Sequence, residues 1–307
     1  MSIVIPTRNA GHRLDDVLDA VDGQVGEFGC RVIAVDSDST DGTRERLRDR
    51  GARVIDVRPA DFNHGTTRNL GLAAAEGEFA VLLVQDAVPA GPGWLQALVA
   101  PLITDDDVAG SFSRQCPAPG ASRLTTEYLS RWIASRPDSR VVGPLTTGEY
   151  EAMSPADRLL VCAFDNVCAC VRLAVWRAHP FRSTSIAEDL EWAREVLLAG
   201  YKLAYAPDAS VWHSHERPVA YEFQRTYLVH RRLQALFGLA TIPSVLSLLR
   251  AVATTVPANV RLAANEERSR ARVALRNAAL GVALPVGQYL GAQSSRTGRD
   301  WIRTGRI

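Results

Sequence analysis

The first hundred residues alternate between short apolar runs and amphipathic segments, and this alternation restricts the fold more than any other feature. The runs SIVIP, CRVIAV, ARVIDV and EFAVLLV are typical of buried strands, and the segments between them carry apolar residues at helical spacing. Strands that alternate with helices predict a parallel sheet with covering helices. We therefore expect an α/β fold with a mostly parallel central sheet flanked by helices.

The rest of the chain carries a weaker pattern. Residues 107–150 are irregular, and FDNVCACVRLAVW predicts a strand that leads into a helix. IAEDLEWAREVLLAGY predicts a helix that ends at Gly200. KLAYAPDASVWHSH predicts two short strands separated by a Pro-Asp turn, and a helical tail begins at YEFQRTYLVHRRLQALFGL.

Charge divides the chain into two regions. Residues 1–216 contain 21 basic and 30 acidic side chains, whereas residues 217–307 contain 14 basic and 4 acidic ones. This shift predicts a domain over 1–216 and a helical C-terminal extension over 217–307. The extension has no unbroken stretch of the roughly 20 apolar residues that span a bilayer. It could be a helical lid packed on the sheet domain, which we favour, or an arginine-rich interfacial helix on anionic lipid.

The cysteines and the first residues indicate the compartment. The five cysteines are odd in number and form no CxxC pair. Cys168 and Cys170 would share one face of a strand, which indicates packing. No basic segment precedes an apolar one at the start of the chain. We expect a reducing, cytoplasmic environment, no structural zinc and no secretory signal.

Polar side chains follow three of the predicted strands. They are Thr7–Arg8–Asn9, Asp36–Ser37–Asp38 and Gln85–Asp86. Because ligands of open α/β sheets bind at the carboxyl ends of strands, these clusters predict a binding site at one edge of the sheet. There is no GxGxxG after the first strand and no P-loop sequence, so neither a dinucleotide fingerprint nor a P-loop is indicated.

Three groups of side chains have two interpretations each. Asp86 could hold Mg²⁺ or Mn²⁺ against a diphosphate, because these cations take oxygen ligands, or it could cap the next helix. His213 and His215 would share a strand face, either as metal ligands or as buried histidines held by hydrogen bonds. Glu188 and Asp189 could supply a general base or could simply favour the positive end of a helix.

The segment FNHGTTRNLG brings an extended stretch to the start of a helix, with Arg68 one turn inside it. Backbone N–H groups at a helix start attract anions, and an arginine adds a forked donor. The alternative is an ordinary helix cap followed by a solvated arginine. The segment alone does not decide between an anion site and a cap.

The order and spacing of six segments resemble those of the family 2 inverting glycosyltransferases with a GT-A fold. The segments are SIVIPTRNAG, VDSDSTDGT, FNHGTTRNLG, LLVQDAVPAGPGWL, FSRQCPAPG and AEDLEWAREVLLAGYKLAYAPDASVWHSHE. The subgroup they look most like is the bacterial rhamnosyltransferases of surface polysaccharide assembly. The resemblance covers residues 2 to about 230 and implies a GT-A-type, Rossmann-like sheet domain.

The resemblance implies roles for particular residues. Asp189 matches the family's base, with Glu188 before it, and Asp86 matches the last acidic position of its metal motif. QDA stands where many relatives have Asp-x-Asp, so His213 would be the second ligand of Mg²⁺ or Mn²⁺. The nucleotide sugar would be bound by Pro6, Thr7, Arg8, Asp36, Asp38, Arg68, Gln85 and Asp86. A sugar or acceptor pocket would include Arg114, Asn166, Trp192 and His215.

The resemblance also implies the reaction. A sugar, with rhamnose as first choice, would pass from a dTDP- or UDP-sugar to a hydroxyl of a glycan or lipid-linked glycan in bacterial surface polysaccharide synthesis. The enzyme would work in the cytoplasm or at the inner face of the plasma membrane, and the tail could mediate membrane contact or self-association. Two rivals stay open, namely a sugar nucleotidyltransferase and a non-catalytic polysaccharide-binding scaffold. No nucleic-acid motif accompanies the basic tail.

Overall fold

The structure is a computed structural model and describes residues 1–26, 29–263 and 270–302. The chain divides into two compact units, a sheet unit and a helical unit. The sheet unit comprises residues 1–118, 132–152 and 160–213, and the helical unit comprises 119–131, 153–159 and the chain from Ser214 onward. The division at His213 is close to the boundary expected from charge, but the two earlier segments of the helical unit gave no signal in the sequence.

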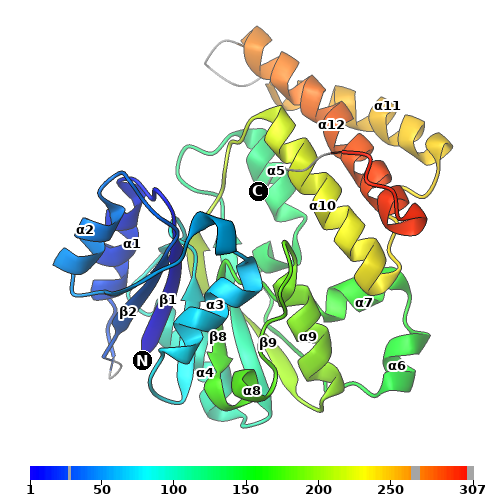
Figure 1. Cartoon of the computed structure of the whole chain (residues 1–307). Coiled ribbons are helices and arrows are strands. Elements are labelled where there is room, and N and C mark those ends of the chain that lie inside the picture. Colours follow the sequence, from blue (N-terminus) through cyan, green and yellow to red (C-terminus); the bar gives the residue numbers. More distant parts are fainter. Residues whose placement is uncertain (27–28, 264–269, 303–307) are drawn as a thin grey trace. The chain divides into compact units, whose positions relative to one another are not determined.

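The sheet unit opens with the predicted alternation of strands and helices (Figure 1). Its first elements are β1 (Ser2–Thr7), α1 (Arg13–Asp22), β2 (Arg31–Asp36), α2 (Thr43–Asp49), β3 (Arg53–Asp56), the 3₁₀ turn η1 (Pro59–Asp61), α3 (His64–Ala73) and β4 (Phe79–Leu83). The others are β5 (Val88–Pro89), α4 (Trp94–Thr104), β6 (Val108–Cys116), η2 (Ile133–Ser135), β7 (Arg140–Val142), α6 (Thr147–Ala152), β8 (Cys168–Arg172), α8 (Leu173–Ala178), α9 (Glu188–Leu198) and β9 (Lys202–Trp212).

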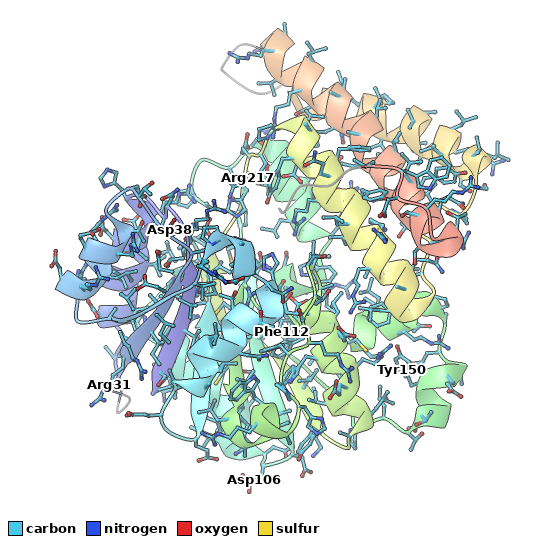
Figure 2. The ribbon with its side chains drawn as sticks, viewed as in Figure 1. Arg31, Asp38, Asp106, Phe112, Tyr150 and Arg217 are labelled. Carbon is cyan, nitrogen blue, oxygen red and sulfur yellow. The ribbon has the colours of Figure 1, made fainter. Side chains whose placement is uncertain are left out.

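One mixed sheet contains all the strands that the structure describes. Their order is β3-β2-β1-β4-β8-β6-β9-β5, and β7 pairs with β9. Strands β1 to β4, β6 and β9 run in one direction, and β5, β7 and β8 run against them. The prediction of a mostly parallel sheet is therefore confirmed. Asp38 lies at the carboxyl edge of this sheet, whereas Arg31 and Asp106 lie at the opposite edge (Figure 2).

Two strands differ from the prediction. Residues 108–116 look irregular in sequence but form the central strand β6, which is covered on both faces and therefore does not alternate between apolar and polar residues. KLAYAPDASVW forms the single strand β9 instead of two strands. A register shift of β9 against β6, between Ser113 and Arg114, accommodates the Pro-Asp pair as a bulge.

Helices cover both faces of the sheet. α1 and α4 pack on the face that presents Ile3 and Ile5. The predicted packing role of Cys168 and Cys170 is confirmed, because both lie in the same core cluster, and burial raises the pKa of the Cys168 thiol to about 12. On the opposite face, α3 packs on β1 and β2.

The contact of α3 with the sheet depends on a glycine. A Cβ atom on Gly71 would lie 2.2 Å from Val4 Cγ1 and 3.1 Å from Val35 Cγ2. We expect Gly71→Ala to lower the free energy of unfolding by about 1–3 kcal/mol, because this overpacking outweighs the better helix propensity of alanine. Denaturant unfolding measures the change. Gly148→Ala is the control, since nothing lies within 4 Å of its added methyl group. Equal effects in the two variants would contradict the close packing.

The helical unit consists of α5 (Arg123–Ser130), α10 (Val219–Phe237), α11 (Val245–Leu262) and α12 (Arg270–Thr297), with a part of α7 (Pro155–Val161). α12 approaches α10 through Gly291, whose added Cβ would lie 2.3 Å from the carbonyl oxygen of Tyr227. α11 and α12 exchange amide hydrogen bonds, from Asn259 Nδ2 to Asn277 O (3.2 Å) and from Asn277 Nδ2 to Asn259 O (3.1 Å). None of the helices in the described part of the chain is long and apolar enough to cross a membrane.

Candidate functional site

The carboxylate of Asp36 holds the two loops that follow β1 and β2. Asp36 is fully buried, and its Oδ2 accepts hydrogen bonds from Thr7 Oγ1 (2.7 Å) and Ser39 Oγ (2.6 Å). Ser39 Oγ also accepts a hydrogen bond from the backbone N–H of Asn9 (2.8 Å). The sequence analysis expected Asp36 to contact a nucleotide. In the structure its oxygens bind the chain itself, so Asp36 supports the loops and does not present a carboxylate at their surface.

In the loop after β2, Asp38 has an exposed carboxylate. Its side chain is 61% exposed, and the guanidinium of Arg44 lies 3.7 Å from Asp38 and 3.4 Å from Asp56. Asp38 has a φ of 56°, and the other described non-glycine residues with positive φ are Asn9 and Ala187. Such backbone conformations cost on the order of 1–3 kcal/mol each and concentrate at functional sites. All three residues adjoin the polar loops at the carboxyl edge.

Gln85 joins the loop after β4 to the loop after β1. Its Oε1 accepts a hydrogen bond from the backbone N–H of Arg8 (2.7 Å), and its Nε2 donates to the carbonyl oxygen of Arg8 (3.2 Å). This reciprocal pair fixes the backbone of Arg8 while the residue as a whole stays exposed. The glutamine therefore positions the loop, whereas the next residue, Asp86, is the one carboxylate of QDA that could bind a metal ion.

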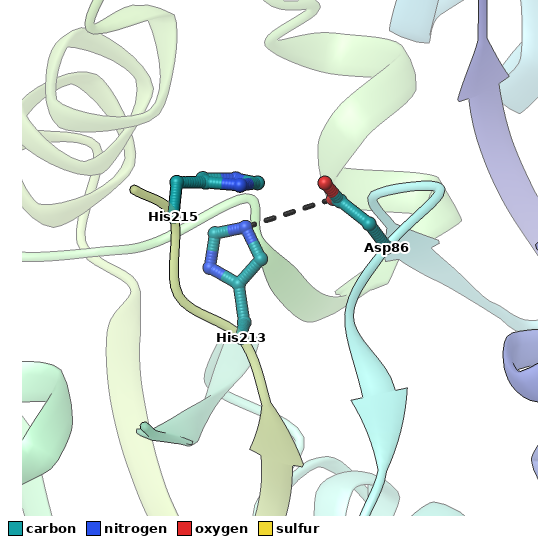
Figure 3. Close-up of side chains that lie close together, drawn as sticks. All are labelled: Asp86, His213 and His215. Carbon is teal, nitrogen blue, oxygen red and sulfur yellow. Dashed lines mark ion pairs between the residues drawn. The ribbon is translucent and has the colours of Figure 1, made fainter. Parts of the chain in front are cut away.

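Asp86 and two histidines form a cluster that could hold a metal ion (Figure 3). Nε2 of His213 lies 3.7 Å from Oδ1 of Asp86, and one ligand atom from each of Asp86, His213 and His215 falls within 4.8 Å of the others. A carboxylate beside imidazoles suits Mn²⁺ better than Mg²⁺, because Mg²⁺ prefers oxygen ligands alone. The donor set thus fits the metal expected from the sequence, and His215 is a further candidate ligand.

Two residues that the sequence analysis did not single out connect to this cluster. Gln115, at the end of β6, has its Oε1 2.9 Å from Nδ1 of His213. Its Nε2 donates to Oδ2 of Asp165 (2.5 Å). The sequence analysis included Gln115 in the segment FSRQCPAPG but assigned it no role, because the strand that carries it was not predicted.

Arg68 is placed inside the sheet unit. Its side chain is buried, and Nη1 lies 3.0 Å from Oε1 of Glu188 and donates to the carbonyl oxygen of His64 (3.1 Å). The first turn of α3 lies close to the backbone of Arg182. This contact requires glycine at position 65, because an added Cβ would lie 2.0 Å from the carbonyl oxygen of Arg182. The sequence analysis expected Arg68 to reach the nucleotide. In the structure its guanidinium is instead engaged by Glu188.

Glu188 and Asp189 begin α9 and differ in their surroundings. Burial would raise the pKa of Glu188, but Arg68 holds it below its usual range, with help from the amide of Asn166, which donates to Glu188 Oε1 (3.2 Å). Burial, the charge of Glu188 and the charge of Asp165 raise the pKa of Asp189 well above its ordinary value. One carboxylate is thus kept ionised and the other becomes more basic, a separation found at acid–base sites.

Backbone amides orient the more basic carboxylate. Asp189 Oδ1 accepts a hydrogen bond from the N–H of Leu190 (2.8 Å), and its Oδ2 accepts one from the N–H of Asn166 (3.3 Å). Asp189 remains partly exposed, so a reacting hydroxyl could approach it.

Two other residues expected in a sugar or acceptor pocket, Trp192 and Arg114, bond to backbone carbonyl groups of the chain. Trp192 is 2% exposed, packs against Phe164 and Phe181, and donates its indole N–H to the carbonyl oxygen of His179 (2.8 Å). It is a core residue, so its expected role in a sugar pocket is not supported. Arg114 is partly exposed, and its Nε donates to the carbonyl oxygen of Ser135 (3.1 Å).

An open α/β sheet binds its ligands at the carboxyl ends of its strands, and the carboxylate and histidines found there could hold a metal ion against a phosphorylated ligand. Residues 2–157 match the Glycosyl transferase family 2 model. The O-antigen chain rhamnosyltransferase WbaN of Salmonella anatum is 33% identical over 240 residues, which cover 74% of this chain and 70% of that protein. The O-antigen chain rhamnosyltransferase RfbN of Salmonella typhimurium is 31% identical over 235 residues, with the same two coverages of 74% and 70%.

Among solved structures, the fold is similar to that of the mannosyltransferase PcManGT of Pyrobaculum calidifontis, determined with GDP-Man and Mn²⁺. The TM-score is 0.61 at 18% identity, over 97% of this chain and 87% of that one. The chain belongs to glycosyl transferase family 2 and has the GT-A-type fold that the sequence predicted. Family membership makes the protein a glycosyltransferase and decides against the nucleotidyltransferase and scaffold alternatives.

Proposed function

We propose that the protein transfers rhamnose from a dTDP- or UDP-sugar to a hydroxyl of a glycan or lipid-linked glycan, with inversion at the anomeric carbon. The sugar and the acceptor class follow from the names of the two O-antigen chain rhamnosyltransferases to which the chain is similar. The pathway would be bacterial surface polysaccharide synthesis at the inner face of the plasma membrane.

The observation that carries this proposal is the separation of the two carboxylates at the start of α9. Asp189 would accept the proton of the attacking hydroxyl, because its raised pKa makes it the stronger base. Glu188, ionised by its contact with Arg68, would supply the negative charge that keeps Asp189 basic. Inversion needs only one attack, so no side chain is assigned as a nucleophile.

The donor would lie along the loops after β1, β2 and β4. We assign the base or ribose contact to the exposed carboxylate of Asp38 and the diphosphate contact to Arg8. Pro6 and Thr7 would line the nucleotide pocket, with Thr7 hydrogen-bonded to the buried carboxylate beneath it.

A divalent metal, Mn²⁺ or Mg²⁺, would be held by Asp86 and His213, with His215 beside them. When bound, such an ion stabilises the negative charge that grows on the leaving diphosphate. The protein's own contribution is to hold the carboxylate and imidazole together at one edge of the sheet, beside the loop that presents Arg8.

Release of the nucleoside diphosphate tests the reaction. We expect incubation of the full chain with dTDP-rhamnose and Mn²⁺ to release dTDP slowly by hydrolysis, and faster when a glycan acceptor is added. GDP-mannose is the matched control donor. Failure to release a nucleotide from dTDP- and UDP-sugars, with or without acceptor, would contradict the proposal.

For the tail we propose, in place of the helical lid that the sequence analysis favoured, peripheral contact with an anionic lipid surface through α11. The apolar side chains of Leu246 and Leu249 are 56% and 62% exposed, and exposed Val260 lies three further turns along the same helix. α11 and α12 contain arginines and no acidic side chain, so charge complementarity favours anionic lipid as the partner.

Vesicle sedimentation tests this contact. We expect binding to phosphatidylglycerol vesicles, weak binding to phosphatidylcholine vesicles, and a loss of binding of at least about tenfold in the double variant Leu246→Ser, Leu249→Ser. Val141→Ser is the control, because Val141 is equally exposed (59%) but belongs to β7. Undiminished binding by the α11 variant would overturn the assignment.

A further inference from the structure

We propose that Asp165 and Gln115 fix the proton of His213 on Nδ1 and thereby keep Nε2 available as a metal ligand. The two residues would act as positioning residues, because they act through His213 and are not among the three candidate ligands. The inference rests on the proposed metal site, but the protonation pattern exists without metal and is measured without it.

The argument starts at Asp165, whose two oxygens both accept hydrogen bonds. Oδ1 accepts from the backbone N–H of Val167 (3.0 Å). Oδ2 accepts from the indole N–H of Trp132 (2.9 Å) and from the amide of Gln115 (2.5 Å). These three donors match the acceptor-only pattern of an ionised carboxylate, and we therefore take the carboxyl group of Asp165 as an acceptor.

This acceptor decides the orientation of the Gln115 amide. An amide has a donating NH₂ end and an accepting oxygen end, and the two ends differ only in their hydrogen bonds. Because Asp165 takes the NH₂ end, Oε1 must face His213. Gln115 is 7% exposed, so bulk water does not compete strongly for either end.

The orientation of Gln115 then decides the protonation of His213. Oε1 lies 2.9 Å from Nδ1, and an amide oxygen at that distance requires a proton on Nδ1. In the neutral imidazole the other nitrogen, Nε2, carries the lone pair. Nε2 faces Asp86 Oδ1 across 3.7 Å, a distance beyond a hydrogen bond. Two electron-rich atoms held in this way are suited to a cation (Figure 3).

The reverse orientation shows why the two residues matter. If the NH₂ end of Gln115 faced Nδ1, the proton of the neutral ring would sit on Nε2. That proton would point toward Asp86 and would have to leave before a metal could bind. Residues that orient a ligating histidine in this way typically change metal affinity by about 10–100-fold.

Nitrogen NMR of the metal-free full chain tests the protonation directly. We expect ¹⁵N spectra, recorded above the ordinary imidazole pKa of about 6.5, to show His213 with Nδ1 protonated and Nε2 unprotonated. The His213 signals are assigned by their absence in His213→Gln. A neutral His213 that carries its proton on Nε2 would overturn the inference, whatever the enzyme's activity or metal affinity.

Variants of Gln115 test whether the position of the His213 proton affects the affinity for Mn²⁺. In Gln115→Leu we expect a population with Nε2–H and a dissociation constant for Mn²⁺, measured from the EPR signal of the free ion, about 10–100-fold higher. Gln115→Glu keeps an oxygen opposite Nδ1 and should keep the wild-type tautomer, with the new carboxyl sharing a proton with Asp165. Ser111→Ala, also buried on β6, should change neither quantity. Unchanged tautomer and Mn²⁺ affinity in Gln115→Leu would contradict the proposal.

Discussion

Replacing Asp189 with asparagine is expected to lower the rate of sugar transfer by about 10²–10⁴-fold, or more, and to leave donor binding intact. The variant keeps the size of the side chain and the hydrogen bond from the N–H of Leu190, but it removes the group that would accept the proton. The measurement is kcat beside the dissociation constant of the nucleoside diphosphate. Glu191→Gln, in the same helical turn, is the control and should retain the rate. An unchanged kcat in Asp189→Asn would remove this residue from the mechanism.

The raised pKa of Asp189 also predicts two pH effects. The base works only when ionised, so the rate should fall with decreasing pH at values above the usual aspartate pKa of about 3.9. The contribution of Asp189 to folding stability has the opposite dependence on pH, because it falls as pH rises. A carboxyl whose pKa is higher in the folded than in the unfolded state stabilises the fold at low pH, and this stabilisation is lost as pH rises through the folded pKa.

It follows that ionised Asp189 destabilises the protein at neutral pH. Asp189→Asn removes a negative charge next to Glu188 and should unfold at a temperature at least as high as the wild type. Thermal unfolding at neutral pH measures this. A variant that is both inactive and clearly less stable would mean that the loss of activity came from misfolding.

Replacing Asp86 with asparagine is expected to lower the rate by roughly 10²–10³-fold and to abolish the effect of Mn²⁺ on nucleotide binding. The substitution keeps the shape of the side chain and removes the only acidic member of the cluster with His213 and His215. Calorimetric titration with and without Mn²⁺ measures the effect.

Asp106→Asn is the matched control for that experiment, because Asp106 is fully exposed at the opposite edge of the sheet (Figure 2). It should bind nucleotide like the wild type in both conditions. If Asp86→Asn kept metal-dependent binding, the metal would have to be held elsewhere, and the assignment of Asp86 would be wrong.

The sequence predicted the first half of the sheet because its strands are apolar and its helices are amphipathic. It missed β6, since a strand buried on both faces, with Ser111 hydrogen-bonded inside the protein, does not alternate. It split β9 at a proline that a bulge accommodates. Local patterns report local periodicity, and neither feature can be recognised without the neighbouring strand.

The same limit applies to the candidate site. Position after a strand made Asp86 and His213 candidates, and the family resemblance together with a helix start made Asp189 one. Burial could not be read from the sequence, so Asp36, Arg68 and Trp192 were assigned to ligands. In the structure they bind the chain itself, and the contacts of Gln115 link segments far apart in sequence.

The most direct test of the account is calorimetric titration of the full chain with dTDP, UDP and GDP, each in the presence and absence of Mn²⁺. The account predicts binding of dTDP or UDP that is strengthened by Mn²⁺ and weak binding of GDP. Absence of binding by both dTDP and UDP, with and without Mn²⁺, would contradict the proposed nucleotide-sugar donor.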